Sequence, residues 1–285
     1  MGALEYVSQQ RPRTFYEERV GVASDVSSDP PIRTDTELVS ERYDPSILAL
    51  VHDPWQTRFP WLVQGTTTRG SARLEFDLGL FAGASPRHVV QVHWDHLMAG
   101  AGMGRAVHAR QVHEGCVRLH RSVVPGLTLT DACDGHVTSE AGVLLGVAVA
   151  DCVPLFVVAP DVRAVAVVHA GWRGAAAGVL EGGLAVLCDE VGAAPSELHM
   201  HLGPSICGDC YEVGPEVFAA LSQPVPDSPM PIDLRRVLAE RAIAGGASPE
   251  AITISTHCTR CTGSELFSHR GGDRARQVGY VGIRD

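Results

Sequence analysis

One cysteine and two histidines occupy positions from which they could share a metal ion. Cys152 lies three residues after the end of the apolar stretch 143–149. His169, 17 residues further along the chain, ends another apolar stretch. His113 lies further upstream and can join them only through space. A thiolate with two imidazoles suits zinc, and three protein ligands leave the fourth tetrahedral position open, as in catalytic sites. Each residue alone is equally compatible with a packing role, so the prediction requires all three to meet.

A glycine-bounded turn follows His169 directly. Residues 171–174 read Gly-Trp-Arg-Gly and lead into an Ala-, Leu- and Val-rich segment that extends to about residue 191. Backbone N–H groups at a helix start, together with the guanidinium of Arg173, favour an anion such as phosphate. The alternative is a turn that only needs small residues, with Arg173 in a surface ion pair.

Two further groups of possible metal ligands are less consistent with known sites. Cys207 with Cys210 and Cys258 with Cys261 form two C-x-x-C pairs, but 47 residues separate the pairs. Zinc ribbons usually separate theirs by about 15–20 residues, which argues against a closed Cys₄ site and leaves it as an alternative.

His199 and His201 alternate with apolar residues along a predicted strand. This period of two places both imidazoles on one strand face, opposite the apolar side chains. We therefore expect both histidines to face solvent and exclude them from the candidate site.

Short β-branched runs and one amphipathic segment are expected to position these residues. The runs 143–149, 155–158 and 164–169 are typical of buried strands at a sheet centre, and adjacent strands would bring Cys152 and His169 to one sheet edge. A helix is expected to follow the turn at residues 171–174 and to extend to about residue 191. A further helix is expected over 233–245, and further strands over 252–255 and 280–283. The pattern is that of an α/β protein.

Composition narrows the class of partner. The 285 residues carry a net charge of −10, so nucleic acids and anionic membranes are not expected partners. All 23 basic residues are arginine, which excludes a Walker-type lysine and a Schiff-base lysine.

The chain divides at about residue 57. Residues 1–57 are rich in charged residues, Ser and Pro, and we expect a partly flexible extension before a main domain at 58–285. No secretory signal is recognisable at the N-terminus, and Asp151 interrupts the longest apolar stretch, so we expect neither export nor a membrane span. Eight cysteines without an export signal favour a reducing compartment, the cytoplasm.

Six motifs in chain order resemble the laccase-domain family, once called multi-copper polyphenol oxidases. The resemblance runs from about Trp61 to the C-terminus, with Phe267-Ser-His-Arg270 as a closing segment in which His269 replaces the usual Tyr. The six motifs are Gln111-Val-His113, Asp134-Gly-His-Val-Thr138, Ala150-Asp-Cys152, His169-Ala-Gly-Trp-Arg-Gly174, Gly203-Pro204 and Tyr211-Glu-Val-Gly214.

The resemblance implies a fold and an activity. The implied fold is a layered α/β/β/α sandwich with mixed sheets and a single main domain. The implied function is a zinc-dependent purine nucleoside phosphorylase, acting on adenosine, inosine or methylthioadenosine, with adenosine deaminase activity. Zinc would be held by His113, Cys152 and His169, the implied catalytic residues. We expect Arg173 and Arg260 to neutralise phosphate or developing charge, and Glu114 or Glu212 to be candidate proton carriers.

Three other functions stay open. Cys152 activated by His169 could be the nucleophile of a metal-free amide hydrolase. A copper-dependent polyphenol oxidase is a second alternative, although such chemistry calls for more clustered histidines than this sequence supplies. A non-catalytic scaffold that binds a partner through residues 1–57 is the third. The sequence does not rank the nucleosides or indicate an oligomeric state.

Overall fold

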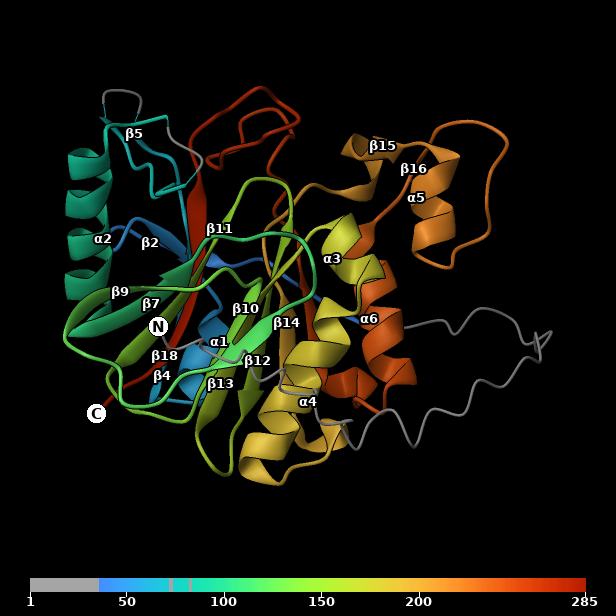
Figure 1. Ribbon diagram of the computed structural model, residues 1–285. Coiled ribbons are helices and arrows are strands. Elements are labelled where there is room, and N and C mark those ends of the chain that lie inside the picture. Colours follow the sequence, from blue (N-terminus) through green and yellow to red (C-terminus); the bar gives the residue numbers. More distant parts are fainter. Residues whose placement is uncertain (1–35, 72–73, 82–83) are drawn as a thin grey trace, which may run out of the picture. The chain divides into compact units, whose positions relative to one another are not determined.

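Two mixed β-sheets lie face to face with helices on their outer surfaces (Figure 1). The computed structural model describes residues 36–285 except 72–73 and 82–83, and all described residues belong to one compact unit. Within these ranges each large sheet has seven strands. In spatial order the first sheet contains β1 (Glu37–Val39), β17 (Ile252–Ser255), β14 (His199–Leu202), β12 (Val153–Ala159), β13 (Ala164–Ala170), β10 (Gly135–Thr138) and β8 (Val117–Leu119). The second contains β2 (Arg42–Asp44), β3 (Ala49–Val51), β4 (Leu62–Thr67), β18 (Gln277–Ile283), β11 (Val143–Val149), β7 (Arg105–Ala109) and β9 (Gly126–Thr130).

Alternating side chains of the central strands fill two different cores. Along β13, Val165 and Val167 point into the space between the sheets, whereas Ala166 and Val168 pack on the outer side, against helices. The period of two therefore yields an apolar run that is buried on both faces. This confirms that the three predicted strands are buried, but β11 belongs to the second sheet, whereas β12 and β13 are neighbours in the first. It also means that His169, two residues beyond Val167, belongs to the face that looks toward the second sheet.

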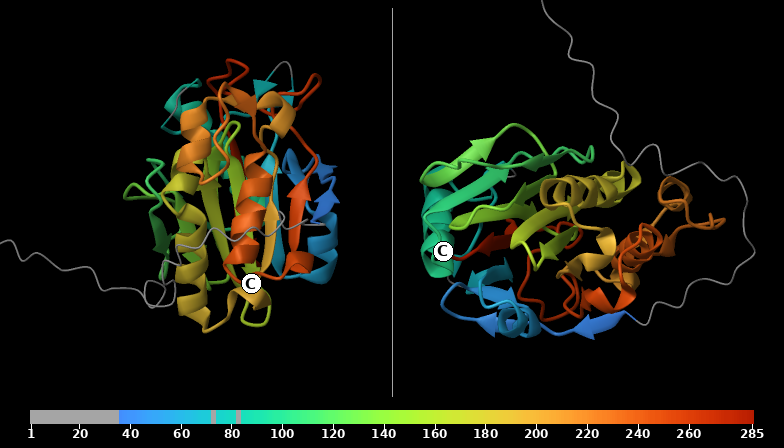
Figure 2. Two further views of the ribbon diagram at one scale, coloured as in Figure 1. Left: turned by 90° about the vertical axis from the view of Figure 1, so that its right-hand side faces the viewer. Right: turned by 90° about the horizontal axis from the view of Figure 1, so that it is seen from below.

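Helices cover both outer faces and complete the layers. α4 (Val179–Val191) and α6 (Leu234–Ala244) pack on the first sheet, and α2 (Arg87–Ala101) packs on the second. Seen from below, the strands lie between α2 and the pair α4 and α6 (Figure 2). The predicted α/β/β/α sandwich is confirmed. The remaining helices are α1 (Asp53–Arg58), α3 (Trp172–Ala176) and α5 (Pro215–Ala220), with the short two-stranded ladders β5 (Gly70–Ser71) with β6 (Leu74–Glu75) and β15 (Glu212–Val213) with β16 (Met230–Pro231).

Two expectations meet a different arrangement. The turn predicted at residues 171–174 already begins the short helix α3, and Gly178, with a left-handed φ of 81°, separates α3 from α4, the helix that ends at residue 191. Residues 1–35 of the predicted extension lie outside the described residues. The rest of that segment contributes β1, β2 and β3 to the two large sheets, and the boundary at residue 57 falls inside α1.

Of the helices in the described ranges, none is long and apolar enough to cross a membrane.

The prediction that His199 and His201 face solvent is wrong. Their strand face looks toward the second sheet, and His201 is fully buried, with its ring stacked on Phe156 at 6.1 Å. Nε2 of His201 lies 2.9 Å from Oε1 of buried Glu41. A second layer covers the face that the sequence pattern alone assigned to water.

Candidate metal centre

His113, Cys152 and His169 converge at one end of the space between the sheets. Their donor atoms lie within 4.8 Å of one another, and the two imidazole rings meet edge to face at 4.7 Å between centroids. The antiparallel register pairs Val153 of β12 with Ala170 of β13. Cys152, just before β12, and His169, next to the last residue of β13, are therefore neighbours. His169 is buried, Cys152 is half-buried and His113 is exposed. The three residues are thus brought together from three separate chain segments.

A buried carboxylate organises the loop that carries His113. Asp134 accepts hydrogen bonds from the backbone N–H groups of four consecutive residues, Val112 at 2.9 Å, His113 at 2.7 Å, Glu114 at 2.8 Å and Gly115 at 3.2 Å. These contacts hold His113 at a left-handed φ of 61°, which is uncommon for a residue with a side chain. Strain of this kind persists where surrounding bonds over-determine the backbone, as they do here.

The same carboxylate faces His169. Oδ1 of Asp134 lies 3.7 Å from Nδ1 of His169, an ion-pair distance that is too long for a hydrogen bond. Nδ1 has no hydrogen-bond partner among the described residues. A carboxylate behind one ring nitrogen, with the opposite nitrogen directed at the cluster, is typical of metal-ligating histidines.

Charge interactions shift the pKa values of Cys152, His169 and Asp134. Burial opposes ionisation of Cys152, but the charge of His169 and hydrogen bonds with both histidines lower the thiol pKa to about 6. Burial likewise disfavours the charged imidazole of His169, yet Cys152 and Asp134 raise its pKa to about 9. Burial raises the pKa of Asp134, but the nearby charge of His169 and the hydrogen bonds from the backbone of the His113 loop lower it to about 2 overall. Without a metal, the site therefore favours a thiolate beside an imidazolium at neutral pH.

Close backbone approach shapes the site on the side of α3. A Cβ atom at Gly171 would lie 2.9 Å from Sγ of Cys152 and 3.3 Å from Cδ2 of His113. Only glycine lets the chain pass the ligand atoms at this distance. On the other side of Cys152, Asp151 adopts a left-handed φ of 84°. Its carboxylate accepts a 2.5 Å hydrogen bond from Thr259 Oγ1 and a 2.6 Å bond from the backbone N–H of Arg270.

The donor set fits zinc. It combines one sulfur and two imidazole nitrogens that lie within 4.8 Å of one another, in a partly open pocket, with a carboxylate positioned behind His169. A Cβ-free backbone at Gly171 leaves room beside the sulfur. These residues are therefore candidate metal ligands.

Two cavities meet at the cluster. The first has a volume of about 430 Å³ and is lined by Phe81, His108 and Gln111, and the second has about 370 Å³ and is lined by Trp172, Arg173 and Tyr211. Both volumes lie within the usual range for small-molecule sites. His113, Ala150, Cys152 and His269 line both cavities.

The first cavity is lined by aromatic rings and by two arginines, Arg110 and Arg276. His108 lies between Phe81, at 5.7 Å, and Trp94, at 5.1 Å, and its Nδ1 is 3.0 Å from the carbonyl oxygen of Gly146. Burial lowers the pKa of His108 to about 4, so its ring is neutral at pH 7. The side-chain amide of Gln111 pairs with both backbone groups of Ala148, at 2.7 and 2.9 Å.

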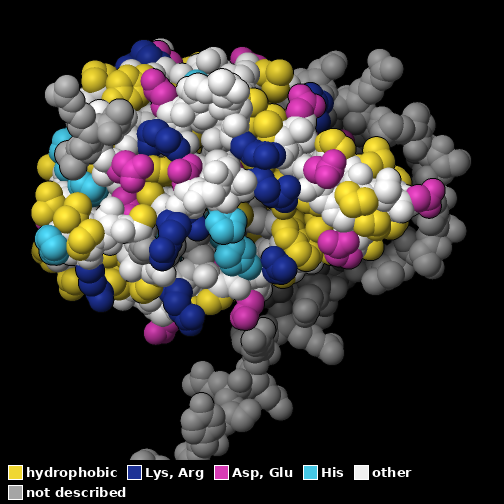
Figure 3. All heavy atoms as spheres, turned by 90° about the horizontal axis from the view of Figure 1, so that it is seen from above, with side chains coloured by type: hydrophobic (Ala, Val, Ile, Leu, Met, Phe, Trp, Pro, Cys, Tyr) yellow, Lys and Arg dark blue, Asp and Glu magenta, His cyan; other side chains and the backbone are white. Residues whose placement is uncertain are grey.

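Arginine side chains line the second cavity. The guanidinium of Arg173 lies over the Trp172 ring at 4.2 Å, and that of Arg270 lies over the Tyr211 ring at 5.2 Å. Figure 3 shows arginines (dark blue) gathered around histidines (cyan) on the face seen from above. Arg260, the other predicted phosphate ligand, lines neither cavity, because its Nη1 donates to the carbonyl oxygen of Cys210 at 3.0 Å. The candidate proton carriers Glu114 and Glu212 also lie outside the lining of both cavities.

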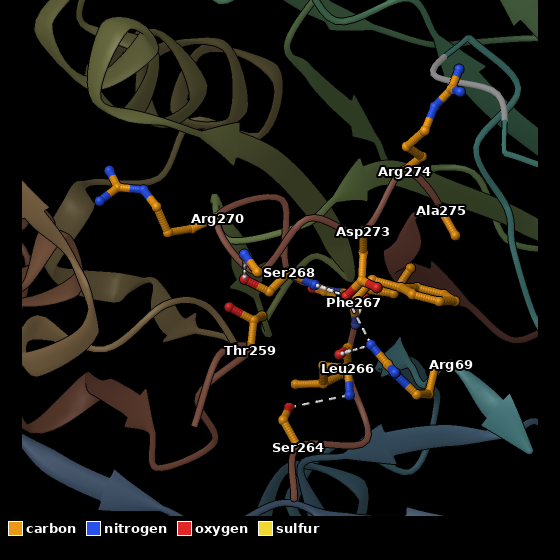
Figure 4. Close-up of polar contacts among 12 residues, drawn as sticks. Arg69, Thr259, Ser264, Leu266, Phe267, Ser268, Arg270, Asp273, Arg274 and Ala275 are labelled. Atoms are coloured by element: carbon orange, nitrogen blue, oxygen red, sulfur yellow. Dashed lines mark hydrogen bonds and ion pairs between the residues drawn. The ribbon is translucent and has the colours of Figure 1, made fainter. Parts of the chain in front are cut away.

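A rigid loop presents Arg270. Arg69 binds both the carbonyl oxygen of Leu266 at 3.0 Å and the carboxylate of Asp273 at 2.8 Å, and the same carboxylate accepts the backbone N–H of Ser268 at 2.8 Å. Figure 4 shows Arg270 extending away from these contacts, in the direction opposite to Arg274. The loop is anchored independently of the Arg270 side chain, which lines the second cavity while its Nη1 donates to the carbonyl oxygen of Glu212 at 2.8 Å.

Sequence reasoning did not select four residues that shape this site: Asp134, Asp151, Gly171 and Arg270. All four lie in the motifs quoted above, so their positions were visible, but their contacts were not. Asp151 directly precedes Cys152, and a charged residue at the end of a buried strand was the available signal.

Comparison with known proteins identifies a family and several relatives. A model of the family described as multi-copper polyphenol oxidoreductase laccase matches residues 64–284. The purine nucleoside phosphorylase YlmD of Geobacillus stearothermophilus is 34% identical over 177 residues, which cover 58% of this chain and 62% of that protein. The adenosine deaminase RL5, from an unknown prokaryotic organism, is 36% identical over 151 residues, covering 49% and 57%. The matches thus span about six-tenths of the length of these relatives.

Solved structures show the same architecture. The crystal structure of YlmD from Geobacillus stearothermophilus superposes with a TM-score of 0.73 at 28% identity, covering 80% of this chain and 93% of that one. The Bacillus licheniformis hypothetical protein YfiH gives a TM-score of 0.76 at 22% identity, over 86% and 99%. The second likeness concerns the fold alone.

Proposed function

The chain belongs to the multi-copper polyphenol oxidoreductase laccase family, and from that membership we propose that it is a zinc-dependent purine nucleoside phosphorylase that also deaminates adenosine. Two relatives in the comparison carry these activities in their names, purine nucleoside phosphorylase and adenosine deaminase. The observation that supports the proposal is the meeting of His113, Cys152 and His169 on the wall shared by two cavities. We propose the cytoplasm as the site of action, because all eight cysteines are free thiols, which suits a reducing compartment.

We assign zinc to His113, Cys152 and His169. When bound, zinc would supply a Lewis acid that stabilises negative charge on oxygen. Asp134 positions two of the three ligands, through the backbone of His113 and through its charge behind His169. Copper is the alternative metal, and soft sulfur with imidazole would accept it too.

We assign the purine to the first cavity and phosphate to the second, each of which is lined by two arginines. A purine is flat, aromatic and uncharged, which suits the walls formed by Phe81 and neutral His108. Phosphate is a dianion, which suits the cavity lined by Arg173 and Arg270. A ribose at the boundary of the two cavities would then lie beside Cys152 and His269.

In phosphorolysis, a phosphate oxygen bonds to C1′ of the ribose as the bond from C1′ to the purine nitrogen breaks. The electron pair leaves with the base, which takes up one proton, and the products are free base and ribose 1-phosphate. Arg173 and Arg270 hold the phosphate and offset its charge as it approaches the sugar. We assign delivery of the proton to His269, since its imidazole lines both cavities.

A metal-free thiol hydrolase is the second candidate. The observation that favours it is the low pKa of Cys152 beside His169, the pairing found in cysteine nucleophiles. Such an enzyme would hydrolyse an amide, and it would keep its activity in a chelator.

The test is an assay with adenosine and phosphate, before and after chelation and after readdition of zinc or copper. We expect adenine and ribose 1-phosphate from phosphorolysis and inosine from deamination, both lost with chelator and restored by zinc. Cys152→Ser should be inactive, and Cys188→Ser, which alters a half-buried cysteine of α4, should be active. Chelator-resistant activity, or no turnover of any purine nucleoside, contradicts the proposal.

A further inference from the structure

Four cysteines outside the active site come together in the fold. The thiols of Cys207, Cys210, Cys258 and Cys261 all lie within 4.8 Å of one another. Neither cavity at the candidate metal centre is lined by any of them. We propose that these four cysteines form a second, closed metal site that binds one zinc ion and has a structural role.

The sulfur separations agree with tetrahedral zinc. Sγ of Cys261 lies 3.9 Å from Sγ of Cys207 and 3.8 Å from Sγ of Cys210. Four sulfurs at about 2.3 Å from a central zinc ion are about 3.8 Å apart. A disulfide needs a separation of about 2.05 Å, and all four cysteines are free.

Backbone groups beside the cluster favour a thiolate at Cys258. The N–H of Cys207 donates to Sγ of Cys258 at 3.3 Å, and the N–H of Arg260 donates to the same sulfur at 3.4 Å. A thiolate accepts such bonds better than a thiol does. The Arg260 guanidinium binds the carbonyl oxygen of Cys210, so a positive charge lies beside the cluster. A zinc ion with four thiolates carries a net charge of −2, which this arginine partly offsets.

Sheet topology explains why 47 intervening residues do not separate the pairs. β14 and β17 are neighbouring parallel strands, with Leu202 paired to Ile254, so the chain leaves both strands at the same sheet edge. Each C-x-x-C pair begins a few residues beyond one of these strand ends. A bridge between Ser205 and Cys258 continues the pairing into the loops. The ribbon spacing of about 15–20 residues applies to pairs joined by a local hairpin, whereas these pairs are brought together by two neighbouring strands.

The site would join two loops that hold Asp151, the residue before Cys152. Ile206, next to Cys207, donates its N–H to the carbonyl oxygen of Asp151 at 3.1 Å. Thr259, next to Cys258, donates its hydroxyl to the Asp151 carboxylate at 2.5 Å. A zinc ion shared by the two loops would fix both partners of Asp151 and so support its left-handed backbone.

Binding has a defined proton balance. Each thiol that becomes a ligand releases its proton to solvent, so up to four protons leave as one zinc ion enters, with no change in oxidation state. The protein needs no oxidant or reductant for this step.

The decisive experiment is native mass spectrometry of the full chain, purified under reducing conditions and loaded with zinc. We expect two zinc ions per wild-type chain and loss of one in Cys261→Ser. Cys188→Ser is the matched control and should keep both ions. Cys152→Ser should lose the ion of the candidate metal centre and keep the ion of the cysteine cluster. The two variants therefore distinguish failure of the proposed function from failure of the proposed second site.

Alkylation of the wild-type chain provides a measurement that does not depend on a variant folding. Cys261 is exposed, yet in the zinc-loaded chain it should resist iodoacetamide until a chelator is added. Equal zinc content in wild type and Cys261→Ser, or alkylation of Cys261 at the same rate with and without chelator, overturns the proposal. A chain mass that is lower by the mass of four hydrogen atoms also overturns the proposal, because it would show that the four cysteines form two disulfides and are not zinc ligands.

Discussion

Asp134 Oδ1 lies 3.7 Å from His169 Nδ1 while its carboxylate also accepts the backbone N–H groups of the His113 loop. One buried side chain thereby positions two of the three candidate ligands, one through backbone geometry and one through charge. The carboxylate has no exposed surface, so its alternative partners are few.

Asp134→Asn tests this relationship. An amide has one acceptor oxygen, so part of the 112–115 loop loses its partner and His169 loses its counter-charge. We expect zinc affinity at the candidate centre to fall by about 10- to 100-fold, and the free energy of unfolding to fall by roughly 3 kcal/mol. Chelator competition and urea unfolding measure the two effects.

Asp77→Asn is the matched control. Asp77 is also fully buried and accepts three backbone N–H groups, from Gly79, Ser85 and Arg276. It should lose stability and keep its zinc affinity. Equal loss of zinc from both variants would show that Asp134 acts only through the fold.

Gly171→Ala tests the close approach of backbone to ligands. The new Cβ would press on Cys152 Sγ at 2.9 Å, so we expect kcat/KM to fall roughly ten- to a hundredfold. Gly174→Ala, in the same short helix, is the control, since its Cβ would meet Val179 Cγ1 at an ordinary 3.5 Å. Unchanged kinetics in Gly171→Ala would show that the backbone yields there.

The pKa of Cys152 predicts a reactivity profile for the chelator-treated chain. A thiol pKa lowered to about 6 makes the thiolate dominant above that pH, so alkylation of Cys152 should rise through a midpoint near pH 6. Burial raises the pKa of Cys188, which should react only in more alkaline solution. Peptide mapping after timed iodoacetamide treatment follows both. A Cys152 midpoint near that of an ordinary thiol would contradict the ion pair with His169.

Arg173→Gln tests the proposed phosphate cavity. Loss of one charged donor should raise the KM for phosphate about tenfold and leave the KM for the nucleoside nearly unchanged. Arg58→Gln is the control, because Arg58 also lies over an aromatic ring, Phe59 at 5.4 Å, and lines neither cavity. A rise in the nucleoside KM alone would reassign Arg173 to the other substrate.

Glu41→Leu tests the buried ion pair with His201. His201 and Ser255 would lose their acceptor, and the free energy of unfolding at pH 7 should fall by about 3–5 kcal/mol. Burial raises the pKa of Glu41, but His201 and Ser255 lower it overall. The wild-type stabilisation is therefore present above the unfolded pKa of about 4.3 and is lost as pH falls through the lower folded value. Urea midpoints across this range should converge for wild type and Glu41→Leu, with exposed Glu37→Gln following wild type throughout.

The sequence by itself determined several of the central elements and the residue types of the site. Local periodicity identifies strands such as β11 and β17 because side chains alternate with a period of two wherever a strand forms. Motif order selected His113, Cys152 and His169 because ligand chemistry is a property of residue type.

Tertiary structure alone decided which side chains meet. The four cysteines converge because β14 and β17 are parallel neighbours, a relation that spacing along the chain does not contain. Arg270, and not Arg260, lines the second cavity because each is held by its own loop. His201 is buried because a second sheet covers its strand face. Contacts of this kind depend on strand order and layer stacking, which arise from burial of the whole apolar surface and not from any local run of residues.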